Sequence, residues 1–309
     1  MTVWLIGSGK MAQDYAKVLE ALDTTFKVIG RGADSSSIFS KQMGIQVQTG
    51  GVKKALEMQD APETAIVAVR PPDHFEVAST LIKAGTRRIL LEKPGGLYFE
   101  QIRLLNEIAV DFRANVWLAY NRRFYASTLK AEEMIEEDGG ITSVQFEFTE
   151  WSHLFTNNPI KEIEYLFLGN STHVVDLVFH MCGIPNDWES WRSGSLEWHQ
   201  TAARFAGAGI TDKGILFSYL ADWESPGSWR IEFLTRKHRL IFRPMEKLHV
   251  MKLRSIIAEQ VLIDDKLDLT FKPGLYRQTE AFLNQNVANL CSLEDQVKFA
   301  LIYSTIAGY

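Results

Sequence analysis

The stretch Val3-Trp4-Leu5-Ile6-Gly7-Ser8-Gly9-Lys10-Met11-Ala12 decides the fold of this chain. Its apolar first half predicts a short strand, and apolar residues recur behind it at helical spacing. A strand, the pattern G-x-G-x-x-A and a helix, in that order, are typical of a dinucleotide-binding turn. Gly7 would make the tight turn, Gly9 would let a pyrophosphate approach the backbone, and Ala12 would let the helix pack closely on the strand.

A strand-to-helix turn without a ligand is the alternative interpretation. The position of the pattern at the start of a series of strand–helix units favours nucleotide binding instead. Amides at the start of the helix would then face the phosphates. The candidate cofactor-binding residues of this turn are Gly7, Ser8, Gly9, Lys10 and Met11.

The second strand, Phe26–Ile29, ends in Gly30 and Arg31 where NAD-binding proteins carry an acid for the ribose hydroxyls. The planar guanidinium of Arg31 suits a 2′-phosphate, and Ser35 lies among three nearby serines. We therefore expect NADP(H) as the favoured cofactor, with NAD(H) possible because Asp34 could reach a ribose. An ordinary surface role for Arg31 remains the alternative.

An apolar strand over residues 64–69 ends in Arg70-Pro71-Pro72-Asp73-His74. This strand end, which like the first is followed by chain-breaking residues, is expected beside the nucleotide, with the two prolines forming one wall of the nucleotide site. His74 is expected to cap the next helix or to position a neighbour. The candidates for cofactor binding are Arg70, Pro71, Pro72 and His74.

The stretch Ile89-Leu90-Leu91-Glu92-Lys93-Pro94-Gly95-Gly96 reads as a buried parallel strand followed by two charged residues and three chain breakers. Ligands gather beyond the carboxyl ends of parallel strands, where Glu92 and Lys93 would emerge as further cofactor-binding candidates. Pro94 biases Lys93 towards an extended backbone. A strand end with a solvated lysine is the alternative for this stretch alone.

Composition sets the bounds for the whole chain. The chain has 309 residues, of which 46% are hydrophobic, enough for one large domain or two. A formal net charge of -5 gives no basic field for nucleic acid. Two cysteines suggest no disulfide framework and fit a reducing compartment. We see neither a membrane-spanning run nor a signal peptide, so we expect a soluble cytoplasmic protein.

The pattern Gly7-x-Gly9-x-x-Ala12, followed by the Arg70–His74 segment and by Glu92-Lys93-Pro94, resembles the Gfo/Idh/MocA oxidoreductases. The resemblance implies an NAD(P)-dependent enzyme that acts on a sugar, a cyclitol or a sugar nucleotide. It also implies an α/β protein with a Rossmann domain at residues 1–122. The expected second domain, 123–309, has a large open, mostly antiparallel sheet and commonly mediates oligomerisation. Lys93 matches the family's usual catalytic lysine.

A second catalytic residue follows from the same resemblance. The pattern H-x-x-D…G-x-P maps the family's catalytic histidine onto His173, which could exchange a proton with a substrate hydroxyl. Many relatives carry an aspartate four residues earlier, where this chain has Gly169; Asn170 could supply a hydrogen bond but no proton transfer. A different register would pair Asp176 with His180. The histidines and Cys182 form no credible zinc set, so no metal is expected.

The substrate candidates lie in two places, Tyr120-Asn121-Arg122 after the sixth strand and Asn170 with Asp176 around the histidine helix. The paired arginines Arg122 and Arg123 could hold a substrate or bridge the domains. Asp176 could instead brace the helix or bind an arginine.

From about residue 188 to 269 the chain is strand-rich, with many tryptophans that we expect to fill a sheet face or a subunit interface. The apolar sheet face predicts a partner subunit, hence a homo-oligomer. Helices are expected over 276–290 and 292–306, packing back on the first domain. Two rival functions stay open: a nucleotide-binding sensor or scaffold without turnover, and glycoside cleavage with a recycled cofactor.

Overall fold

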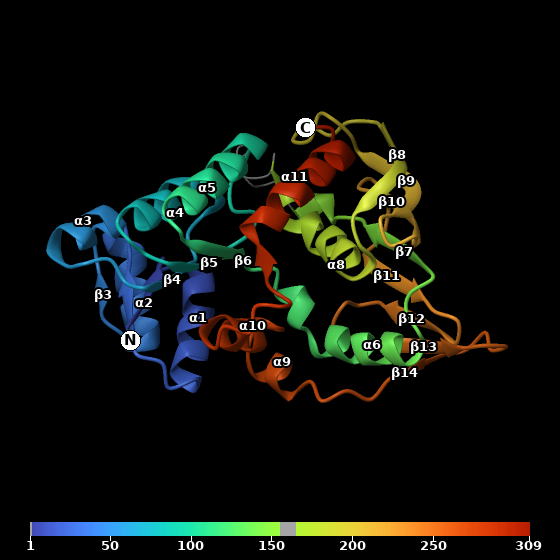
Figure 1. Cartoon of the computed structure of the whole chain (residues 1–309), viewed down its shortest axis with the longest axis horizontal. Coiled ribbons are helices and arrows are strands. Elements are labelled where there is room, and N and C mark those ends of the chain that lie inside the picture. The colour runs from blue at the N-terminus through green and yellow to red at the C-terminus, as the bar shows by residue number, and fades with distance from the viewer. Residues whose placement is uncertain (1, 155–164) are drawn as a thin grey trace. The chain divides into compact units, whose positions relative to one another are not determined.

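The structure, a computed structural model, describes residues 2–154 and 165–309. The chain forms two compact units, and each unit has its own sheet (Figure 1). Unit 1 comprises Met1–Asn121 and Leu267–Ala300, and unit 2 comprises Arg122–Lys266 and Leu301–Tyr309. None of the helices in the described part of the chain is long and apolar enough to cross a membrane.

Unit 1 is built on a seven-stranded sheet in the order β15-β6-β5-β4-β1-β2-β3. Neighbouring strands run parallel except for β15, which is antiparallel to β6. The inner strands β1 and β4 are buried along their whole length, which explains why they are continuous apolar runs. The strands are β1 (Val3–Ile6), β2 (Phe26–Ile29), β3 (Val47–Gln48), β4 (Thr64–Val67), β5 (Arg88–Leu91), β6 (Asn115–Leu118) and β15 (Cys291–Ser292).

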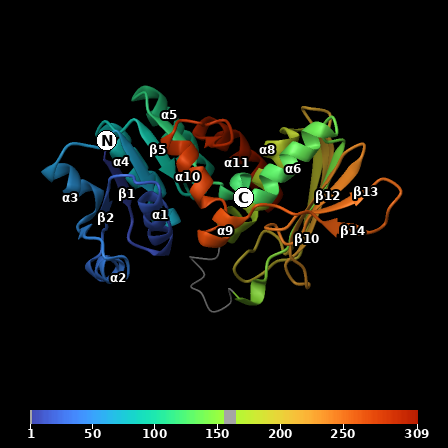
Figure 2. The same cartoon turned by 90° about the horizontal axis from the view of Figure 1, so that it is seen from below.

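Helices cover both faces of this sheet (Figure 2). The helices α1, α2 and α10 pack around one face, and α3, α4 and α5 pack against one another on the other. Their bounds are α1 (Lys10–Ala21), α2 (Ala33–Met43), α3 (Gly51–Met58), α4 (His74–Lys83), α5 (Phe99–Asp111), α9 (Lys266–Thr270), α10 (Leu275–Leu283) and α11 (Leu293–Ala307). A short 3-10 turn, Pro71–Asp73, precedes α4.

Unit 2 is built on an eight-stranded sheet in the order β14-β13-β12-β11-β7-β10-β9-β8. All neighbouring pairs are antiparallel except β7 and β10, which run parallel. The strands are β7 (Ser143–Phe148), β8 (Pro185–Ser193), β9 (Arg204–Thr211), β10 (Leu216–Asp222), β11 (Trp229–Leu234), β12 (His238–Phe242), β13 (His249–Lys252) and β14 (Ala258–Gln260). The predicted fold class, with its mostly antiparallel second sheet, is confirmed.

Two helices, α6 (Ala126–Glu137) and α8 (Thr172–Cys182), lie on one face of this sheet in both views (Figures 1 and 2). The core between α8 and the strands is aromatic: the ring of Phe146 meets Phe179 edge to face at 5.9 Å. A π-helical turn, Phe167–Ser171, leads directly into α8. The residues on the covered face are therefore fixed by packing, whereas β8 and β10 expose Trp191, Leu216 and Leu220.

One predicted element is wrong in its extent. The helix expected over 276–290 ends at Leu283, and Gln285 adopts a left-handed backbone with φ of 59°. The chain then forms β15, which pairs with β6 at the edge of the first sheet. The left-handed backbone at Gln285 is incompatible with a continued right-handed helix, so the helix cannot extend to residue 290.

Candidate active site

A cavity of about 690 Å³ lies at the carboxyl ends of β1, β2 and β4 in unit 1. The strand order reverses between β1 and β4, and ligands of open parallel sheets bind at such a switch point. Its volume lies in the ordinary range for ligand pockets. Nine of the predicted cofactor-binding residues line it: Gly7, Ser8, Gly9, Lys10, Met11, Arg31, Ser35, Arg70 and Pro71.

The turn after β1 leaves room for a phosphate. Gly7 has φ of 124°, and a Cβ there would stand 2.3 Å from the carbonyl oxygen of Ala68, so only glycine fits. A Cβ on Gly9 would meet no atom within 4 Å, because it would point into the open groove. Since α1 begins at Lys10, its first amides face the same space. The turn therefore fits the pyrophosphate of a dinucleotide.

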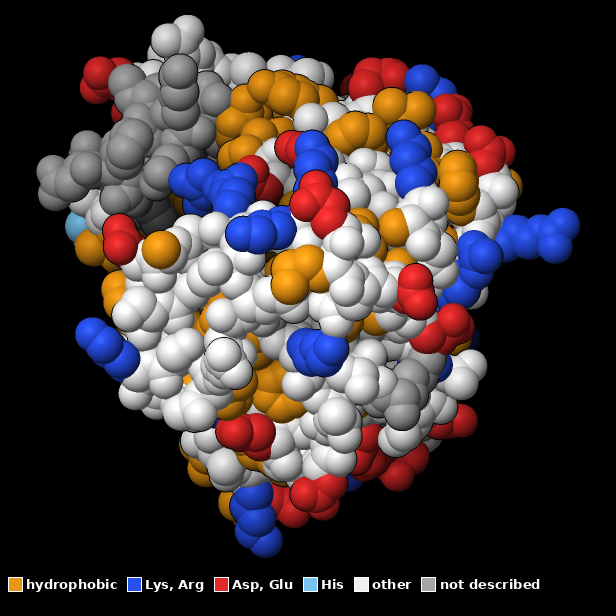
Figure 3. All heavy atoms as spheres, turned by 90° about the vertical axis from the view of Figure 1, so that its left-hand side faces the viewer, with side chains coloured by type: hydrophobic (Ala, Val, Ile, Leu, Met, Phe, Trp, Pro, Cys, Tyr) orange, Lys and Arg blue, Asp and Glu red, His pale blue; other side chains and the backbone are white. Residues whose placement is uncertain are grey.

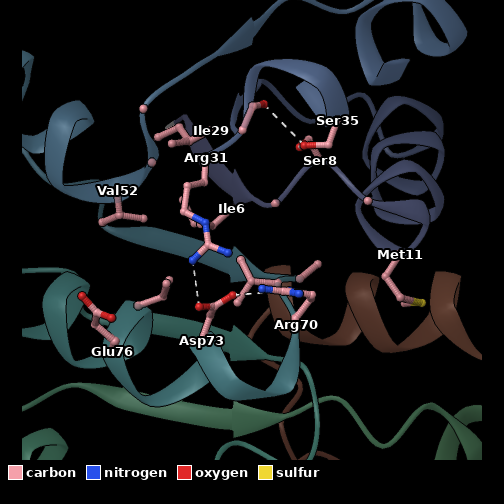
Figure 4. Close-up of a pocket in the computed structure, with 18 of the residues that line it drawn as sticks. Ile6, Ser8, Met11, Ile29, Arg31, Ser35, Val52, Arg70, Asp73 and Glu76 are labelled. Atoms are coloured by element: carbon pink, nitrogen blue, oxygen red, sulfur yellow. Dashed lines mark hydrogen bonds and ion pairs between the residues drawn. The ribbon is translucent and has the colours of Figure 1, made fainter. Parts of the chain in front are cut away.

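Three charged side chains meet across the cavity (Figure 4). The guanidinium of Arg31 donates from Nη1 to Oδ1 of Asp73 at 2.8 Å, and Nε of Arg70 lies 3.8 Å from Oδ2 of the same carboxylate. The Arg31 side chain is 66% exposed and that of Asp73 only 20%, so the arginine extends from the rim of the cavity to a more buried carboxylate. The sequence pattern predicts no role for Asp73.

Ser35, which follows β2, lines the cavity. The hydroxyls of Ser8 and Ser35 are 2.9 Å apart, which joins the first and second turns of the cavity (Figure 4). Asp34 is exposed on α2 and does not line the cavity. The carboxylate of Asp34, the candidate for binding a ribose, therefore lies outside the cavity lining.

Four of the predicted cofactor-binding residues lie outside this cavity lining: Pro72, His74, Glu92 and Lys93. Pro72 is exposed on the 3-10 turn. His74 is fully buried, its Nε2 donating to the carbonyl oxygen of Val69 at 3.1 Å, and burial lowers its pKa to about 4. Its ring is thus neutral near pH 7 and braces the start of α4, which agrees with a positioning role rather than a cofactor contact.

The charged residues after β5 are held from several sides. The hydroxyl of Tyr15, on α1, donates to Oε1 of Glu92 at 2.9 Å. Burial raises the pKa of Glu92, which the charge of Lys93 and the Tyr15 hydrogen bond partly counteract. The carbonyl of Pro94 accepts a hydrogen bond from the buried amide of Gln296 at 2.9 Å, which anchors the loop that carries Lys93. Lys93 itself is half-buried.

In unit 2, His173 lies in the first turn of α8 and is 6% exposed. Its ring is 6.1 Å from the ring of Trp229 on β11. Farther along α8, burial lowers the pKa of His180 to about 3, so this histidine is neutral. Lys93 belongs to unit 1 and His173 to unit 2.

The structure corrects the substrate role predicted for Asp176. Its carboxylate accepts hydrogen bonds from Nε and Nη2 of Arg123 at 2.9 and 2.6 Å, with side chains only 1% and 3% exposed. A fully buried, doubly bonded carboxylate has no surface for a substrate, and it matches the arginine-binding alternative. Two further substrate candidates, Tyr120 and Asn121, are also buried; the amide of Asn121 donates to the carbonyl of Pro273.

The remaining substrate candidates, Arg122 and Asn170, line a second cavity, which lies within unit 2. Sequence reasoning missed the acid beside them: Glu150, after β7, accepts a hydrogen bond from Asn170 at 2.7 Å. No local pattern marks Glu150, because its partners are twenty or more residues away.

Charges are mixed on the face of the molecule that Figure 3 presents. Lys and Arg side chains alternate there with Asp and Glu, and hydrophobic side chains form small groups (Figure 3). Among the described residues visible on this face, no extended basic area offers a track for nucleic acid.

Comparison with known proteins gives one family and many similar structures. Residues 1–120 match the Gfo/Idh/MocA model, described as an oxidoreductase family with an NAD-binding Rossmann fold. A search of curated proteins gives no match. UDP-N-acetylglucosamine 3-dehydrogenase from Acidithiobacillus ferrooxidans is similar over 100% of this chain and 97% of its own, with a TM-score of 0.76 and 16% identity.

Two other solved structures are similar over nearly the whole chain. Levoglucosan dehydrogenase in complex with NADH and levoglucosan is 17% identical, with a TM-score of 0.77, covering 100% of this chain and 96% of that one. An oxidoreductase from Agrobacterium radiobacter in complex with NAD+, L-tartaric acid and magnesium is 11% identical, with a TM-score of 0.79, covering 98% and 94%. Identities this low show a common fold.

Proposed function

Because residues 1–120 match the Gfo/Idh/MocA oxidoreductase model with its NAD-binding Rossmann fold, we propose that the chain is an NAD(P)-dependent dehydrogenase of sugars, cyclitols or sugar nucleotides. The resemblance drawn from the sequence, and with it the expectation of an oxidoreductase, is confirmed. The observation that carries the proposal is the open groove above Gly9 at the switch point of the sheet.

Unit 1 would bind the cofactor. The amides at the start of α1 and the bare backbone of Gly9 would receive the pyrophosphate, with Ser8 beside them. The cofactor, when bound, supplies the hydride acceptor or donor. Glu92 and the anchored Pro94 loop would orient Lys93 beyond the end of β5.

Two side chains would handle the substrate oxygen. Lys93 would hydrogen-bond the oxygen on the reacting carbon, and His173 would exchange the proton with it. Both are only partly exposed, as proton-transfer groups that exclude bulk water should be. The position four residues before His173 is Gly169, so the acid that many relatives carry there would have to come from another element.

The adenosine end favours NADP(H) in this proposal. Arg31 and Ser35 line the cavity after β2, and Asp34 does not. A guanidinium and a hydroxyl are donors suited to a 2′-phosphate. Two of the similar structures hold NADH or NAD+, so NAD(H) remains the alternative cofactor.

We also propose a homo-oligomer formed through the sheet of unit 2. Trp191, Leu216 and Leu220 are each more than half exposed on β8 and β10. Large apolar side chains gathered on one face of the sheet are better covered by a second subunit than by water. Both cysteines are buried and unbridged, which supports a reducing compartment such as the cytoplasm.

The proposal is tested by replacing the two proton-handling groups. Lys93→Ala and His173→Ala should each lower kcat by roughly a hundredfold or more, the usual contribution of a positioned acid or base. Cofactor affinity, measured by isothermal titration, should stay close to that of the wild type. His180→Ala on the same helix is the matched control and should keep its turnover.

An active Lys93→Ala enzyme would refute the role of the lysine. If the wild-type protein binds NADPH or NADH tightly but oxidises and reduces nothing in a carbohydrate panel, that result favours a nucleotide-binding sensor or scaffold over a dehydrogenase. A cofactor that copurifies and recycles without net change would favour glycoside cleavage.

A further inference from the structure

Unit 2 contains its own cavity, of about 490 Å³, beside the first turn of α8. Its walls combine two tryptophans with a small set of charged groups, and this mixture of apolar surface and few polar groups is typical of small-molecule sites. The charged and tryptophan side chains of its lining are Arg122, Glu150, Trp151, Trp229, Arg243 and Glu246. Of these, only Arg122 was expected from the sequence.

The charges around this cavity balance. Among its described lining residues, Arg122 and Arg243 carry positive charge, and Glu150 and Glu246 carry negative charge. A phosphate or diphosphate group, with up to two negative charges, needs an excess of cations or helix amides around it. A neutral ligand with many hydroxyls needs something else, namely donors and acceptors in similar number.

The carboxylate of Glu150 is a preorganised hydrogen-bond acceptor in the cavity wall. Its side chain is 4% exposed, and its carboxylate receives hydrogen bonds from Asn170 at 2.7 Å, Ser171 at 2.5 Å and Trp229 Nε1 at 3.3 Å. Three donors from two elements fix the carboxylate in one orientation before any ligand arrives. Asn170 and Ser171 lie directly before α8, so the acid stands beside the helix that carries His173.

Trp229 joins the other groups of the wall. The guanidinium of Arg122 stacks 4.9 Å from the centre of its ring, and the ring of His173 is 6.1 Å away. An indole face offers a flat apolar platform, onto which the C–H face of a saturated ring can pack. The indole Nε1 of Trp229 also donates to Glu150, so the hydrogen bond links the aromatic ring to the carboxylate.

We propose that this cavity binds the substrate as an uncharged polyhydroxylated ring, a free sugar or cyclitol, with Glu150 accepting hydrogen bonds from its hydroxyls and Trp229 packing against its face. The inference rests on the proposed dehydrogenase function and narrows its substrate class by excluding phosphorylated sugars and sugar nucleotides. Glu150 also supplies, from the end of β7, an acid next to α8 although position 169 is glycine.

The test compares ligands on the full-length wild-type protein with bound NADPH or NADH. The probes are D-glucose, D-galactose, myo-inositol and levoglucosan, each set against glucose 6-phosphate and UDP-glucose. Dissociation constants come from isothermal titration, which needs no turnover. At least one neutral compound should bind about tenfold or more tightly than both charged ones, because like charge beside Glu150 is unfavourable.

Two variants separate the role of Glu150 from its contribution to folding. Glu150→Gln should weaken neutral-ligand binding by about tenfold or more, since it removes a charged hydrogen-bond acceptor. Glu232→Gln is the matched control: Glu232 is 8% exposed and paired with Arg230 on the same strand as Trp229, but it does not line the cavity. It should bind the ligand like the wild type, and thermal melting should show both variants folded.

Tighter binding of the phosphate or UDP compound, binding of none of the probes, or an unchanged affinity in folded Glu150→Gln would each overturn the inference. Neutral ligands that bind without being oxidised or reduced would refute the dehydrogenase proposal and leave the cavity assignment standing. Turnover restricted to UDP-glucose would refute the cavity assignment and leave the dehydrogenase proposal standing.

Discussion

Replacing Arg31 with alanine should change the choice of cofactor. Arg31 follows β2 and reaches into the cavity at the ends of β1, β2 and β4, where its Nη1 lies 2.8 Å from Oδ1 of Asp73. A guanidinium with five donors can keep one hydrogen bond to Asp73 and offer others to a 2′-phosphate. NADH has no such phosphate, so the loss should fall on NADPH alone.

The size of the effect follows from the exposure of Arg31. A hydrogen bond to a charged group contributes about 1.5–3 kcal/mol. Because the Arg31 side chain is 66% exposed, solvent screening favours the lower end of that range. About 1.5 kcal/mol corresponds to roughly a tenfold change in binding. We therefore expect the Michaelis constant for NADPH to rise about tenfold, while that for NADH stays nearly constant.

The assay measures initial rates with each cofactor at fixed ionic strength, because exposed charge pairs weaken with salt. Arg103→Ala is the matched control, since Arg103 is also exposed and ion-paired, to Glu100 and Glu107 on α5, but lies outside the cavity. An equal rise for both cofactors, or a lower Michaelis constant for NADH in the wild-type protein, would refute the reasoning about Arg31.

Two other predictions concern buried polar pairs. Tyr15→Phe keeps the ring but removes the hydrogen bond that lowers the pKa of Glu92, so the pKa of Glu92 should rise further. The acid limb of the kcat/KM profile should then move to higher pH. An unchanged limb would show that Glu92 does not control activity. Asp176→Asn leaves the buried charge of Arg123 uncompensated and should lower the free energy of unfolding by about 3–5 kcal/mol in urea titrations, whereas a loss below about 1 kcal/mol would contradict a buried ion pair.

The elements that depend on local patterns could be predicted from the sequence. The turn at Gly7 and Gly9 needs only a strand end, a backbone with positive φ and a helix start, all within a few residues. The strand before Lys93 is a short apolar run bounded by breakers, and the structure has it at Arg88–Leu91. Local signals of this kind do not depend on how the rest of the chain folds.

Strands β8 and β9 were harder to recognise because packing against the neighbouring strands, rather than their own residue pattern, determines them. β9 contains Gly207 and Gly209, which weaken the strand signal. In the fold these glycines are required: a Cβ on Gly207 would meet the ring of Tyr219, and a Cβ on Gly209 would meet Trp188. Close packing across neighbouring strands thus replaces the propensity that the sequence lacks.

The supporting residues of the candidate sites were missed because they are distant in sequence from the residues they contact. Tyr15 is 77 positions from Glu92, and Gln296 is 202 positions from Pro94. No periodicity in one sequence links residues so far apart. The helix expected over 276–290 failed differently, since no glycine or proline marks its end at Leu283.

The central claim is that Lys93 and His173 act on the same substrate oxygen. A crystal structure of the protein with NADPH and a neutral sugar or cyclitol measures this directly. The account predicts Lys93 Nζ and a ring nitrogen of His173 both at roughly 2.6–3.2 Å from the oxygen of the carbon next to the nicotinamide. Two side chains that face separate cavities, with the substrate oxygen touching neither, would contradict it.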